Sequence, residues 1–553
     1  MVGLSRDAQL LAGACLLRLA LALTLATYFA PDEYWQGPEV AHALVFGYGH
    51  TTWEWSTARL RSHLHPAIFA ALYALLAAIG ADTPAAVIYA PRLLQALVQA
   101  ATDVLVVRLV IARLPRGKLV FPAAAAVQLG SWYAAFCGTR TLSSTMAALP
   151  VAAALLAWPA SGSSASLLAA DPASLPQADR ATLRRCILQS AGCMAAAVAL
   201  RPTAAVIFAA LYTATLVQVA AAAGGRGLFS SALAHYTLSV LLPAALGAVA
   251  LLVAIDSALY CAWTLAPLNF VSFNLAHSVA AFYGTHPWHW YLTAGVPELL
   301  GPALVLFLAS WLCGPVAGAA AALRQLDVVL AAALGVYSLL GHKESRFLYP
   351  LLAVFHVRTT AGAIGLYSAA VAGATRTKRW AAASLIGLVA IAAVVLTAYT
   401  CFVHQRGAID VMWDIQARAH GPHPPPSVTF LTPCHATPFH SFVHAPNLTL
   451  RFLDCSPPFA EDAYRTRGVL DFASYVDEAE AFALDPAHWL EQHGDSIDDS
   501  PGALVVAFAS IEPHIRPWLD SASYVESARH FHAHLAVDRG VQSELVVWKR
   551  SAT

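Results

Sequence analysis

Four carboxylates and six aromatic side chains are concentrated in residues 30–63, directly after the first long apolar stretch of the chain. Asp32 and Glu33 are adjacent in "APDEYWQ", and Glu54 lies between two tryptophans in "TWEW". Carboxylates at a membrane boundary are unfavourable unless they are solvated or used. A helix that is capped by Asp32, beside Pro31, explains the first pair without any chemistry. It leaves the aromatic residues unexplained, whereas carboxylates among flat aromatic faces suit a sugar-binding site.

A second concentration of charge is the stretch His-Lys-Glu-Ser-Arg at residues 342–346. Its ordinary explanation is that Lys343 and Arg346 extend from a helix end to the membrane surface, or that Glu344 pairs with Arg346. Such bases should prefer the cytosolic side, and the topology below places these on the opposite side. An anionic ligand such as a phosphate explains that placement, since Arg offers forked donors and Lys a point charge. We therefore expect His342, Lys343 and Arg346 to bind a phosphate.

Further polar residues fall at the same predicted membrane level. Arg140 in "TRTLSS", Arg201 in "RPTA" and Arg92 in "PRLLQ" are each explained more simply as helix-end arginines, but together they would surround a cavity that receives phosphates. An aromatic cluster occurs in "FYGTHPWHWY", residues 282–291. Alone it would be an interfacial belt, but its mixture with polar groups suits a binding loop, formed by His286, Trp288 and His289. Trp35 and Trp55 join Glu54 as expected sugar contacts.

Membrane helices must position these residues. The chain has 553 residues, of which 58% are hydrophobic and 12% charged, whereas globular domains carry about 25% charge. Basic residues are scattered and no nucleic-acid-binding motif occurs, so no nucleic-acid partner is expected. Several apolar segments exceed the length of eighteen residues that indicates a membrane span. They cover residues 8–29, 65–81, 85–111, 119–136, 141–158, 186–200, 203–223, 232–255, 291–312, 326–340, 347–370 and 380–402.

Lys and Arg set the orientation of these segments. "RLPRGK" (113–118), "RATLRR" (180–185) and "RTKRW" (376–380) should face the cytosol. All of them do so if residues 65–81 lie along the interface, which predicts about eleven spans. The loop 30–84 and the tail then share the other side. Asn447 in "NLT" is an N-glycosylation acceptor, so we expect that side to be the lumen of the endoplasmic reticulum.

The tail differs from the rest of the chain in composition. Residues 401–553 hold 19 of the 32 acidic and 10 of the 32 basic side chains. Short β-type runs, "SVTFL", "LTLRFLDC", "ALVVAFAS" and "SELVVWK", predict a small α/β domain. The fold class is thus a polytopic α-helical membrane protein, with a membrane domain at 1–402 and a soluble lumenal domain at 403–553. Residues 159–190, rich in Ser and Ala, suggest a flexible loop. Cys434 and Cys455 either pair or stay free thiols.

Several of these stretches together resemble a known family. They are "PDEYWQ", "FGYG", "TWEW", "TRTLS", "RPTA", "FYGTHPWHWY", "HKESRF", "HQRG" (404–407), "PCHATPFHS" (433–441) and "LRFLDCSP" (450–457). The chain resembles the GPI mannosyltransferase 3 type within the dolichyl-phosphate-mannose-dependent α-mannosyltransferases of the GT-C superfamily. Two departures stand out: Ala30 occurs where the family often has His, and Ser144-Thr145-Met146 follow "TRTLS" where Asn and Glu are usual.

The resemblance implies transfer of a third, α-1,2-linked mannose from dolichyl-phosphate mannose to a GPI precursor lipid in the endoplasmic reticulum membrane. Inversion at the donor carbon requires one general base, for which we expect Asp32, with Glu33 orienting it or sharing its role. The phosphate leaving group needs positive charge, which His342, Lys343 and Arg346 would supply. No cofactor is required, although the carboxylate pair also suits Mg²⁺ or Mn²⁺.

Two alternatives remain open at this stage. A sister mannosyltransferase that extends the lipid-linked N-glycan precursor shares the first and "HKESRF" motifs. A transporter lined by charged residues is more remote, because transporters tend to show repeats and broken midplane helices. No repeat is visible in this chain, and its polar residues gather on one predicted face.

Overall fold

Most of the apolar stretches form helices in the computed structural model. The structure describes residues 5–56, 58–115, 117–159, 163–223, 231–276, 284–312, 319–371, 375–457, 475–535 and 542–551. Over these ranges, nine helical segments are long and apolar enough to cross a membrane. The chain is a multi-pass helical membrane protein with a C-terminal mixed sheet, as its composition and its tail predict.

Two compact units divide the chain. The first combines Met1–Leu21, Leu94–Leu268 and Tyr283–Thr397, and the second combines Ala22–Leu93, Asn269–Phe282 and Ala398–Thr553. The predicted boundary at residue 402 lies close to the last of these limits. The second unit also includes the whole of the loop 30–84, which the sequence assigned to the membrane domain. The division of roles between a catalytic domain and a tail stays a prediction.

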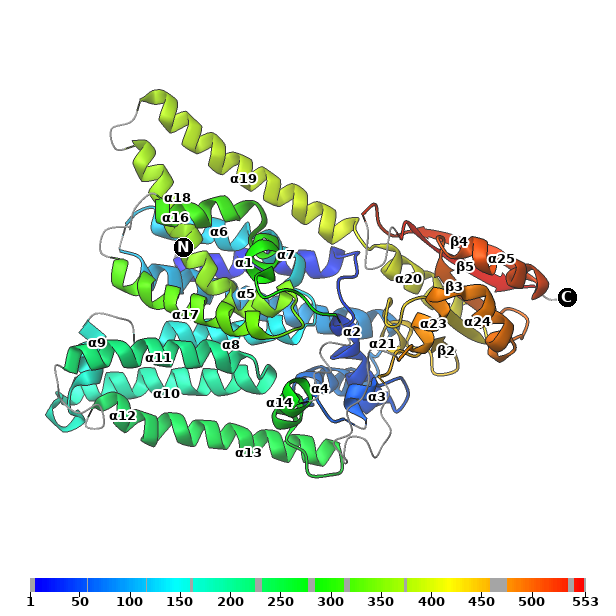
Figure 1. The fold of residues 1–553 in the computed structure, drawn as a ribbon, viewed down its shortest axis with the longest axis horizontal. Coiled ribbons are helices and arrows are strands. Elements are labelled where there is room, and N and C mark those ends of the chain that lie inside the picture. The colour runs from blue at the N-terminus through cyan, green and yellow to red at the C-terminus, as the bar shows by residue number, and fades with distance from the viewer. Residues whose placement is uncertain are drawn as a thin grey trace. The chain divides into compact units, whose positions relative to one another are not determined.

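The first unit is a helical assembly in which α10 and α11 run side by side, with α13 beside α10 (Figure 1). Short 3₁₀ or π turns join several helices: η2 (Pro172–Ser174), η4 (Thr237–Leu241), η6 (Tyr291–Gly295), η7 (Gly301–Ala303) and η8 (Ser345–Leu351). The helices that lie wholly or largely in this unit are α1 (Arg6–Thr24), α5 (Pro84–Arg113), α6 (Val120–Leu129), α7 (Trp132–Cys137), α8 (Ser143–Ala157), α9 (Ser163–Ala169), α10 (Gln177–Leu200), α11 (Ala204–Ala223), α12 (Ala232–Tyr236), α13 (Leu242–Leu259), α15 (Val296–Leu300), α16 (Leu304–Leu312), α17 (Ala320–Leu339), α18 (Leu352–Val371) and α19 (Arg376–Phe402).

Two predicted spans correspond to shorter helices. The segment 119–136 is divided into α6 and α7, and Ser131 caps α7 by accepting a hydrogen bond from the backbone nitrogen of Ala134. The segment 141–158 forms α8, of 15 residues. At 1.5 Å per residue such a helix extends about 22 Å, less than the roughly 30 Å of a bilayer core. The expected total of about eleven spans therefore stays a prediction.

The prediction of a flexible loop over 159–190 was wrong in part. Helix α9 begins at Ser163, and α10 begins at Gln177, well before its apolar portion. The start of α10 is polar, QADRATLRR, and every one of these residues is compatible with a helix. A helix can extend beyond the apolar stretch that first identifies it, because polar side chains keep its outer turns in water.

A buried ion pair joins two helices of the first unit. Nε of Arg18 in α1 lies 2.8 Å from Oδ2 of Asp103 in α5, and both side chains are 0% exposed. Gln99 and Gln128 each donate to Oδ1 of Asp103 at 2.7 Å. Charges within a membrane domain are unfavourable unless paired. The carboxylate of Asp103 thus has hydrogen-bond partners on both oxygens, and these contacts link α1, α5 and α6.

The second unit contains a five-stranded mixed sheet with the order β2-β1-β3-β5-β4. Strands β1, β2 and β3 are parallel neighbours, whereas β5 pairs antiparallel with both β3 and β4. The strands are β1 (Ser427–Leu431), β2 (Thr449–Phe452), β3 (Leu504–Phe508), β4 (Tyr524–Phe531) and β5 (Glu544–Arg550). Its helices and turns are α2 (Asp32–Trp35), α3 (Pro38–Phe46), η1 (Trp53–Trp55), α4 (Leu64–Ala78), most of α14 (Ala266–Ala276), α20 (Gly407–Ala419), α21 (His440–Val443), α23 (Glu478–Leu484), α24 (Pro486–His493), η9 (Gly494–Ser496) and α25 (Glu512–Ser521).

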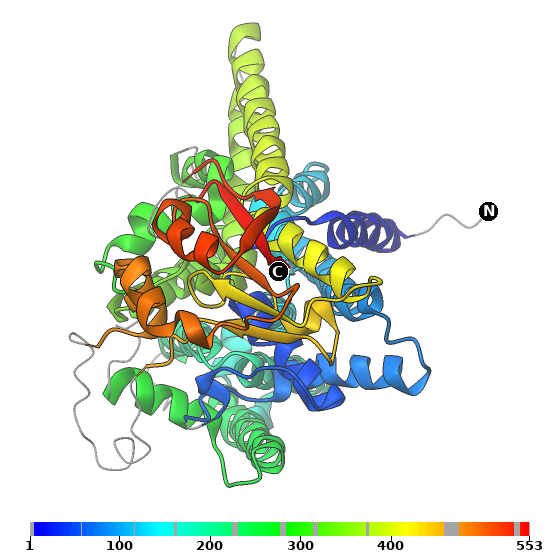
Figure 2. The ribbon, with the colours of Figure 1, turned by 90° about the vertical axis from the view of Figure 1, so that its right-hand side faces the viewer.

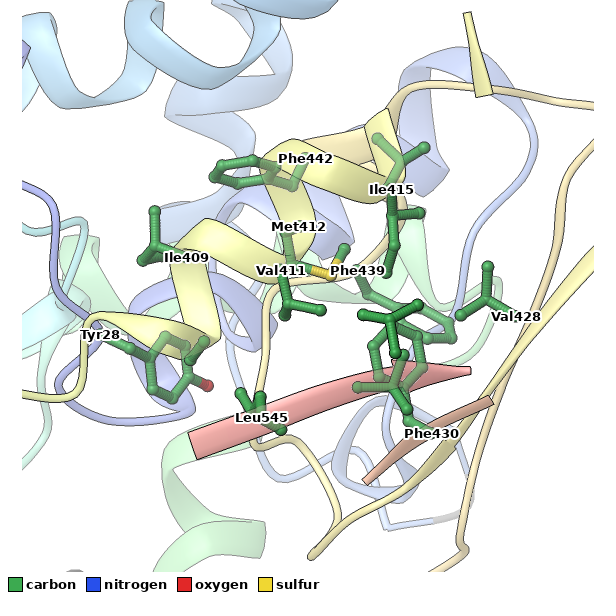
Figure 3. Packing of buried hydrophobic residues seen from close by; sticks show 14 of the residues in the cluster. Tyr28, Ile409, Val411, Met412, Ile415, Val428, Phe430, Phe439, Phe442 and Leu545 are labelled. Carbon is green, nitrogen blue, oxygen red and sulfur yellow. The ribbon is translucent and has the colours of Figure 1, made fainter. Parts of the chain in front are cut away.

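Helices cover both faces of this sheet (Figure 2). Val506 of β3 and Val547 of β5 face the cluster that contains α20, whereas their chain neighbours Val505 and Val546 face α24 and α25. Alternate side chains of a strand point to opposite faces, so a strand buried on both faces is apolar throughout. Tyr28 and Trp35, which flank Asp32 in the chain, belong to the same cluster as α20. Figure 3 shows Tyr28 in this cluster.

Candidate active site

Asp32 and Glu33 form the first turn of α2 in the second unit. Pro31 occupies the N-cap position without any side-chain capping hydrogen bond, so Asp32 is not the cap of this helix. Asp32 is partly exposed, whereas Glu33 is only 1% exposed. The two adjacent carboxylates therefore differ in accessibility, and Asp32 is the more accessible of the two.

A buried arginine lies beside this turn. Arg92 donates to the hydroxyl of Tyr34, and its Nη1 donates to the backbone oxygen of Leu25 at 3.3 Å. Its guanidinium also interacts electrostatically with Glu33. The sequence grouped Arg92 with phosphate-binding arginines, but the structure brings it to the helix that carries the carboxylates. There its hydrogen bonds to Tyr34 and Leu25 support the orientation of α2.

Trp35, an expected sugar contact, is 3% exposed. Its indole nitrogen donates to the backbone oxygen of Thr437 at 3.0 Å, and its ring centre lies 4.2 Å from that of His435. The ring therefore packs against a loop of the tail. A contact between Trp35 and a sugar stays a prediction.

Glu39 was not predicted from the sequence to take part in the site. It is 0% exposed in α3, and its Oε1 accepts hydrogen bonds from the backbone nitrogen of Phe439 at 2.9 Å and from Oγ of Ser441 at 2.6 Å. Burial raises the pKa of Glu39 to about 7, although the bonds from Ser441 and Phe439 work in the opposite direction. One signal was available: Glu39 is the single acidic residue in the helix PEVAHALVF, whose other residues are apolar except for His42.

Glu54 and Trp55, the other expected sugar contacts of this loop, lie in the 3₁₀ turn η1. Oε1 of Glu54 accepts from Nη2 of Arg61 at 2.9 Å. Trp55 is 6% exposed, and its ring centre lies 5.0 Å from that of His63. These contacts fix the shape of the loop, so the structure explains Glu54 and Trp55 as supports, and sugar binding by them stays a prediction.

The basic cluster belongs to the first unit. Nδ1 of His342 lies 3.1 Å from the backbone oxygen of Gly284, and Nε2 lies 3.0 Å from Oε1 of Glu344. Both partners are acceptors, so the imidazolium form, in which both ring nitrogens donate, satisfies both contacts. Burial lowers the pKa of His342, but the hydrogen bond and charge of Glu344 outweigh it and raise the pKa. Arg346 pairs with the same Glu344.

Lys343 is 2% exposed and donates to three backbone oxygens. These are the oxygens of His286, at 2.8 Å, of Leu340 and of Gly341. Burial lowers the pKa of Lys343. Its three ammonium hydrogens are thus engaged, so Lys343 contributes a positive charge to the region and at the same time holds the loop that follows Gly284.

That loop carries the expected acceptor residues His286, Trp288 and His289. The backbone nitrogen of His286 donates to the oxygen of Gly341 at 3.0 Å, and its ring stacks on Trp290 at 4.7 Å. Trp288 is 67% exposed, and His289 is exposed as well. The structure therefore brings the predicted aromatic loop and the predicted phosphate cluster together, and it leaves Trp288 available to a ligand. Phe282 and Tyr283 of the same motif lie outside the described residues.

Arg201 and Arg140 also belong to the first unit. Nη1 of Arg201 donates to Oγ of Ser143 at 3.3 Å, and its Cζ lies 4.9 Å from the ring centre of Phe347, next to Arg346. Arg140 is 0% exposed, and its Nε donates to the backbone oxygen of Phe136 at 2.8 Å. Arg201 thus joins the cluster through Phe347, whereas Arg140, which lies between α7 and α8, binds the last turn of α7.

Within the described chain, Cys434, His435 and Cys455 are the residues close enough to form a three-ligand metal site. The two cysteines instead form a disulfide, with a Cα–Cα distance of 6.0 Å. The pairing that the sequence left open is thus made, and these sulfur atoms are not available as thiolate ligands. Asn447 is exposed just before β2, a position accessible to modification.

Comparison with known proteins gives consistent matches over most of the chain. Residues 10–444 match the Alg9-like mannosyltransferase family. GPI alpha-1,2-mannosyltransferase 3 of Mus musculus is 35% identical over 97% of this chain and 87% of its own length. Mannosyltransferase APTG1 of Arabidopsis thaliana is 32% identical over 96% of this chain and 90% of its own length.

Among solved structures, ArnT from Cupriavidus metallidurans bound to undecaprenyl phosphate resembles this chain with a TM-score of 0.54. The alignment covers 99% of this chain and 98% of the ArnT chain at 11% sequence identity. At that identity the likeness shows the fold alone, which is the GT-C type expected from the sequence.

Proposed function

The chain belongs to the Alg9-like mannosyltransferase family, and we propose that it adds the third, α-1,2-linked mannose during GPI-anchor biosynthesis. The observation that carries this function is the 35% identity to the murine GPI alpha-1,2-mannosyltransferase 3 over 97% of the chain. The match runs through both compact units, so it is not the product of one shared motif. The protein is a multi-pass membrane glycosyltransferase.

The donor is dolichyl-phosphate mannose, and the acceptor is a GPI precursor that carries two mannoses on glucosaminyl-phosphatidylinositol. Both substrates are lipids, and the enzyme works in the endoplasmic reticulum membrane with its active site on the lumenal side. The function of the relatives, the sequon at Asn447 and the disulfide between Cys434 and Cys455 support this placement, since disulfides persist in oxidising compartments.

Transfer is a single in-line displacement at the anomeric carbon of the donor mannose. The oxygen of the acceptor hydroxyl forms the new bond to that carbon while the bond to the phosphate oxygen breaks. Asp32 takes the hydroxyl proton, and the electron pair leaves with dolichyl phosphate. The partial exposure of Asp32, beside a buried Glu33, supports this assignment. General-base catalysis contributes roughly 10²–10⁴-fold.

Positive charge stabilises the departing phosphate. His342 and Arg346 are the side chains assigned to it, with Lys343 and Arg201 adding to the positive potential. A forked guanidinium such as that of Arg346 suits a phosphate. Both His342 and Arg346 are balanced by Glu344 in the structure, and a phosphate would compete with this carboxylate for the two cations. The expected contacts of Trp288 and His289 with the acceptor complete the assignment.

The function is tested by supplying the purified protein with radiolabelled dolichyl-phosphate mannose and two alternative acceptors. We expect label in the two-mannose GPI precursor, and α-1,2-mannosidase should release it. Transfer only to the lipid-linked N-glycan precursor would replace this function with that of the sister enzymes. Movement of a sugar across proteoliposomes without any transfer would indicate a transporter.

A further inference from the structure

One short segment of the tail, residues 435–444, contacts the chain on both sides of Asp32. The hydroxyl of Tyr28, before Asp32, donates to the backbone oxygen of His435 at 2.6 Å. The indole nitrogen of Trp35, after Asp32, donates to the backbone oxygen of Thr437 at 3.0 Å. The turn that carries the carboxylates is thus held at two points by residues about 400 positions away.

Glu39 makes the central contact between this segment and α3. Its carboxylate accepts from the backbone nitrogens of Phe439, at 2.9 Å, and Ser441, at 3.1 Å, and from Oγ of Ser441 at 2.6 Å. These are donors at the start of α21, whose own N-cap residue, Phe439, makes no side-chain capping bond. A carboxylate at this position accepts hydrogen bonds from backbone N–H groups that have no partner within the helix. Glu39 of α3 therefore caps α21.

The segment also contacts the middle of α3, where Nε2 of His42 lies 2.9 Å from Nδ1 of His444. His435 and His444 have φ values of 57° and 49°. Non-glycine residues seldom adopt this conformation, and it persists where the surrounding contacts hold it in place.

Other elements of the tail also contact this segment. Gln416 of α20 donates to the backbone oxygen of Phe442 at 2.7 Å. Figure 3 shows Phe439 and Phe442 in the same apolar cluster as Met412 of α20 and Phe430 of β1. The disulfide between Cys434 and Cys455 joins the residue before this segment to the chain that follows β2.

We propose that residues 434–455 form a positioning bracket, with the contact between Glu39 and Ser441 at its centre, that fixes the place of the Asp32 carboxylate for catalysis. This rests on the proposed role of Asp32 as the base. Glu39 and Ser441 are positioning residues, since they act through α2 and α3 and not on the substrate. A shift of about 1 Å in a catalytic group can lower a rate roughly 10²-fold, so loosening the bracket reduces turnover while the fold remains.

Two serines of the second unit provide a matched pair of variants. Ser441 is 3% exposed and donates to Glu39 at 2.6 Å, whereas Ser427 is 5% exposed and donates to Asp498 at 2.5 Å. Ser441→Ala and Ser427→Ala each remove one serine–carboxylate hydrogen bond, which is buried for Ser441 and part-buried for Ser427. Both variants should keep the fold, and only Ser441→Ala removes a hydrogen bond between the bracket and α3.

Two measurements on the full-length variants decide the proposal. We expect Ser441→Ala to lower kcat for mannose transfer by roughly tenfold or more, with both KM values nearly unchanged, and to speed amide hydrogen exchange in residues 30–46. Ser427→Ala should do neither. The bracket is overturned if Ser441→Ala exchanges its amide hydrogens in residues 30–46 as slowly as the wild type, or if its kcat is unchanged. It is also overturned if Ser427→Ala loses as much kcat as Ser441→Ala. If the wild type transfers no mannose, the proposed function fails, and the exchange comparison still decides the bracket.

Discussion

At the scale of single residues, His342 is the group whose protonation state matters most. Its ring nitrogens face the oxygen of Gly284 and the carboxylate of Glu344, while Lys343 and Arg346 add positive charge nearby. Its pKa in the folded protein is raised. The stability that this histidine contributes is therefore fully present below its ordinary pKa, about 6.5, and is lost as the pH rises through the folded value.

The raised pKa of His342 gives a prediction for donor binding. As the pH rises through the folded pKa of His342, the cluster loses one positive charge, and the KM for dolichyl-phosphate mannose should increase. His342→Asn, which stays neutral at every pH, should show a high KM without that rise. The measurement is the donor KM across the neutral range for both proteins. Identical pH profiles would exclude His342 from the phosphate site.

At the scale of elements, the contact between α1 and α5 depends on the pair of Arg18 and Asp103. Removing one member of a buried pair is strongly destabilising, by roughly 3–5 kcal/mol, because the other charge stays buried. Arg18→Met should therefore destabilise the protein strongly. The double variant Arg18→Met with Asp103→Asn should recover much of the loss, since the amide still accepts from Gln99 and Gln128. Thermal unfolding in detergent tests this, and a double variant as unstable as the single one would contradict it.

Helices and strands were predictable from the sequence where all of their side chains lie in an apolar environment. The apolar runs of β1, β3 and β5 identified these strands, and the long apolar helices were found within a few residues of their bounds. Strand β4, YVESARHF, was missed because it is an edge strand with mostly exposed side chains. The outer turns of α10 were missed because hydropathy identifies the part of a helix that lies in the membrane, and these turns are polar.

The candidate site was predictable only in part, for a similar reason. Charge in an apolar chain was enough to point to Asp32 and to residues 342–346. The partners that fix these groups are distant: Ser441 lies 402 positions from Glu39, and Gly284 lies 58 positions from His342. No local pattern contains such pairings. The burial of Trp35 was not predictable either, because tryptophan occurs both in exposed and in packed positions, and its contact with a sugar stays a prediction.

At the scale of the whole molecule, the orientation in the membrane can be tested at Asn447. The sequon is exposed beside β2, so a lumenal tail should carry a glycan there. Endoglycosidase treatment should increase the electrophoretic mobility of the wild type and leave Asn447→Gln unchanged. An unchanged wild type, together with protease access to the tail in sealed microsomes, would reverse the orientation.

The central claim is that this molecule transfers mannose with Asp32 as its base, and Asp32→Asn tests it most directly. The amide keeps the size and hydrogen bonding of the side chain but removes its basicity, and Pro31, not Asp32, is the N-cap of α2. Transfer should fall by roughly 10²–10⁴-fold. The measurement is the return of surface GPI-anchored proteins in cells that lack the third GPI mannosyltransferase, at low and matched expression. The wild type should restore them and Asp32→Asn should not, whereas equal restoration by both would show that Asp32 is not the base.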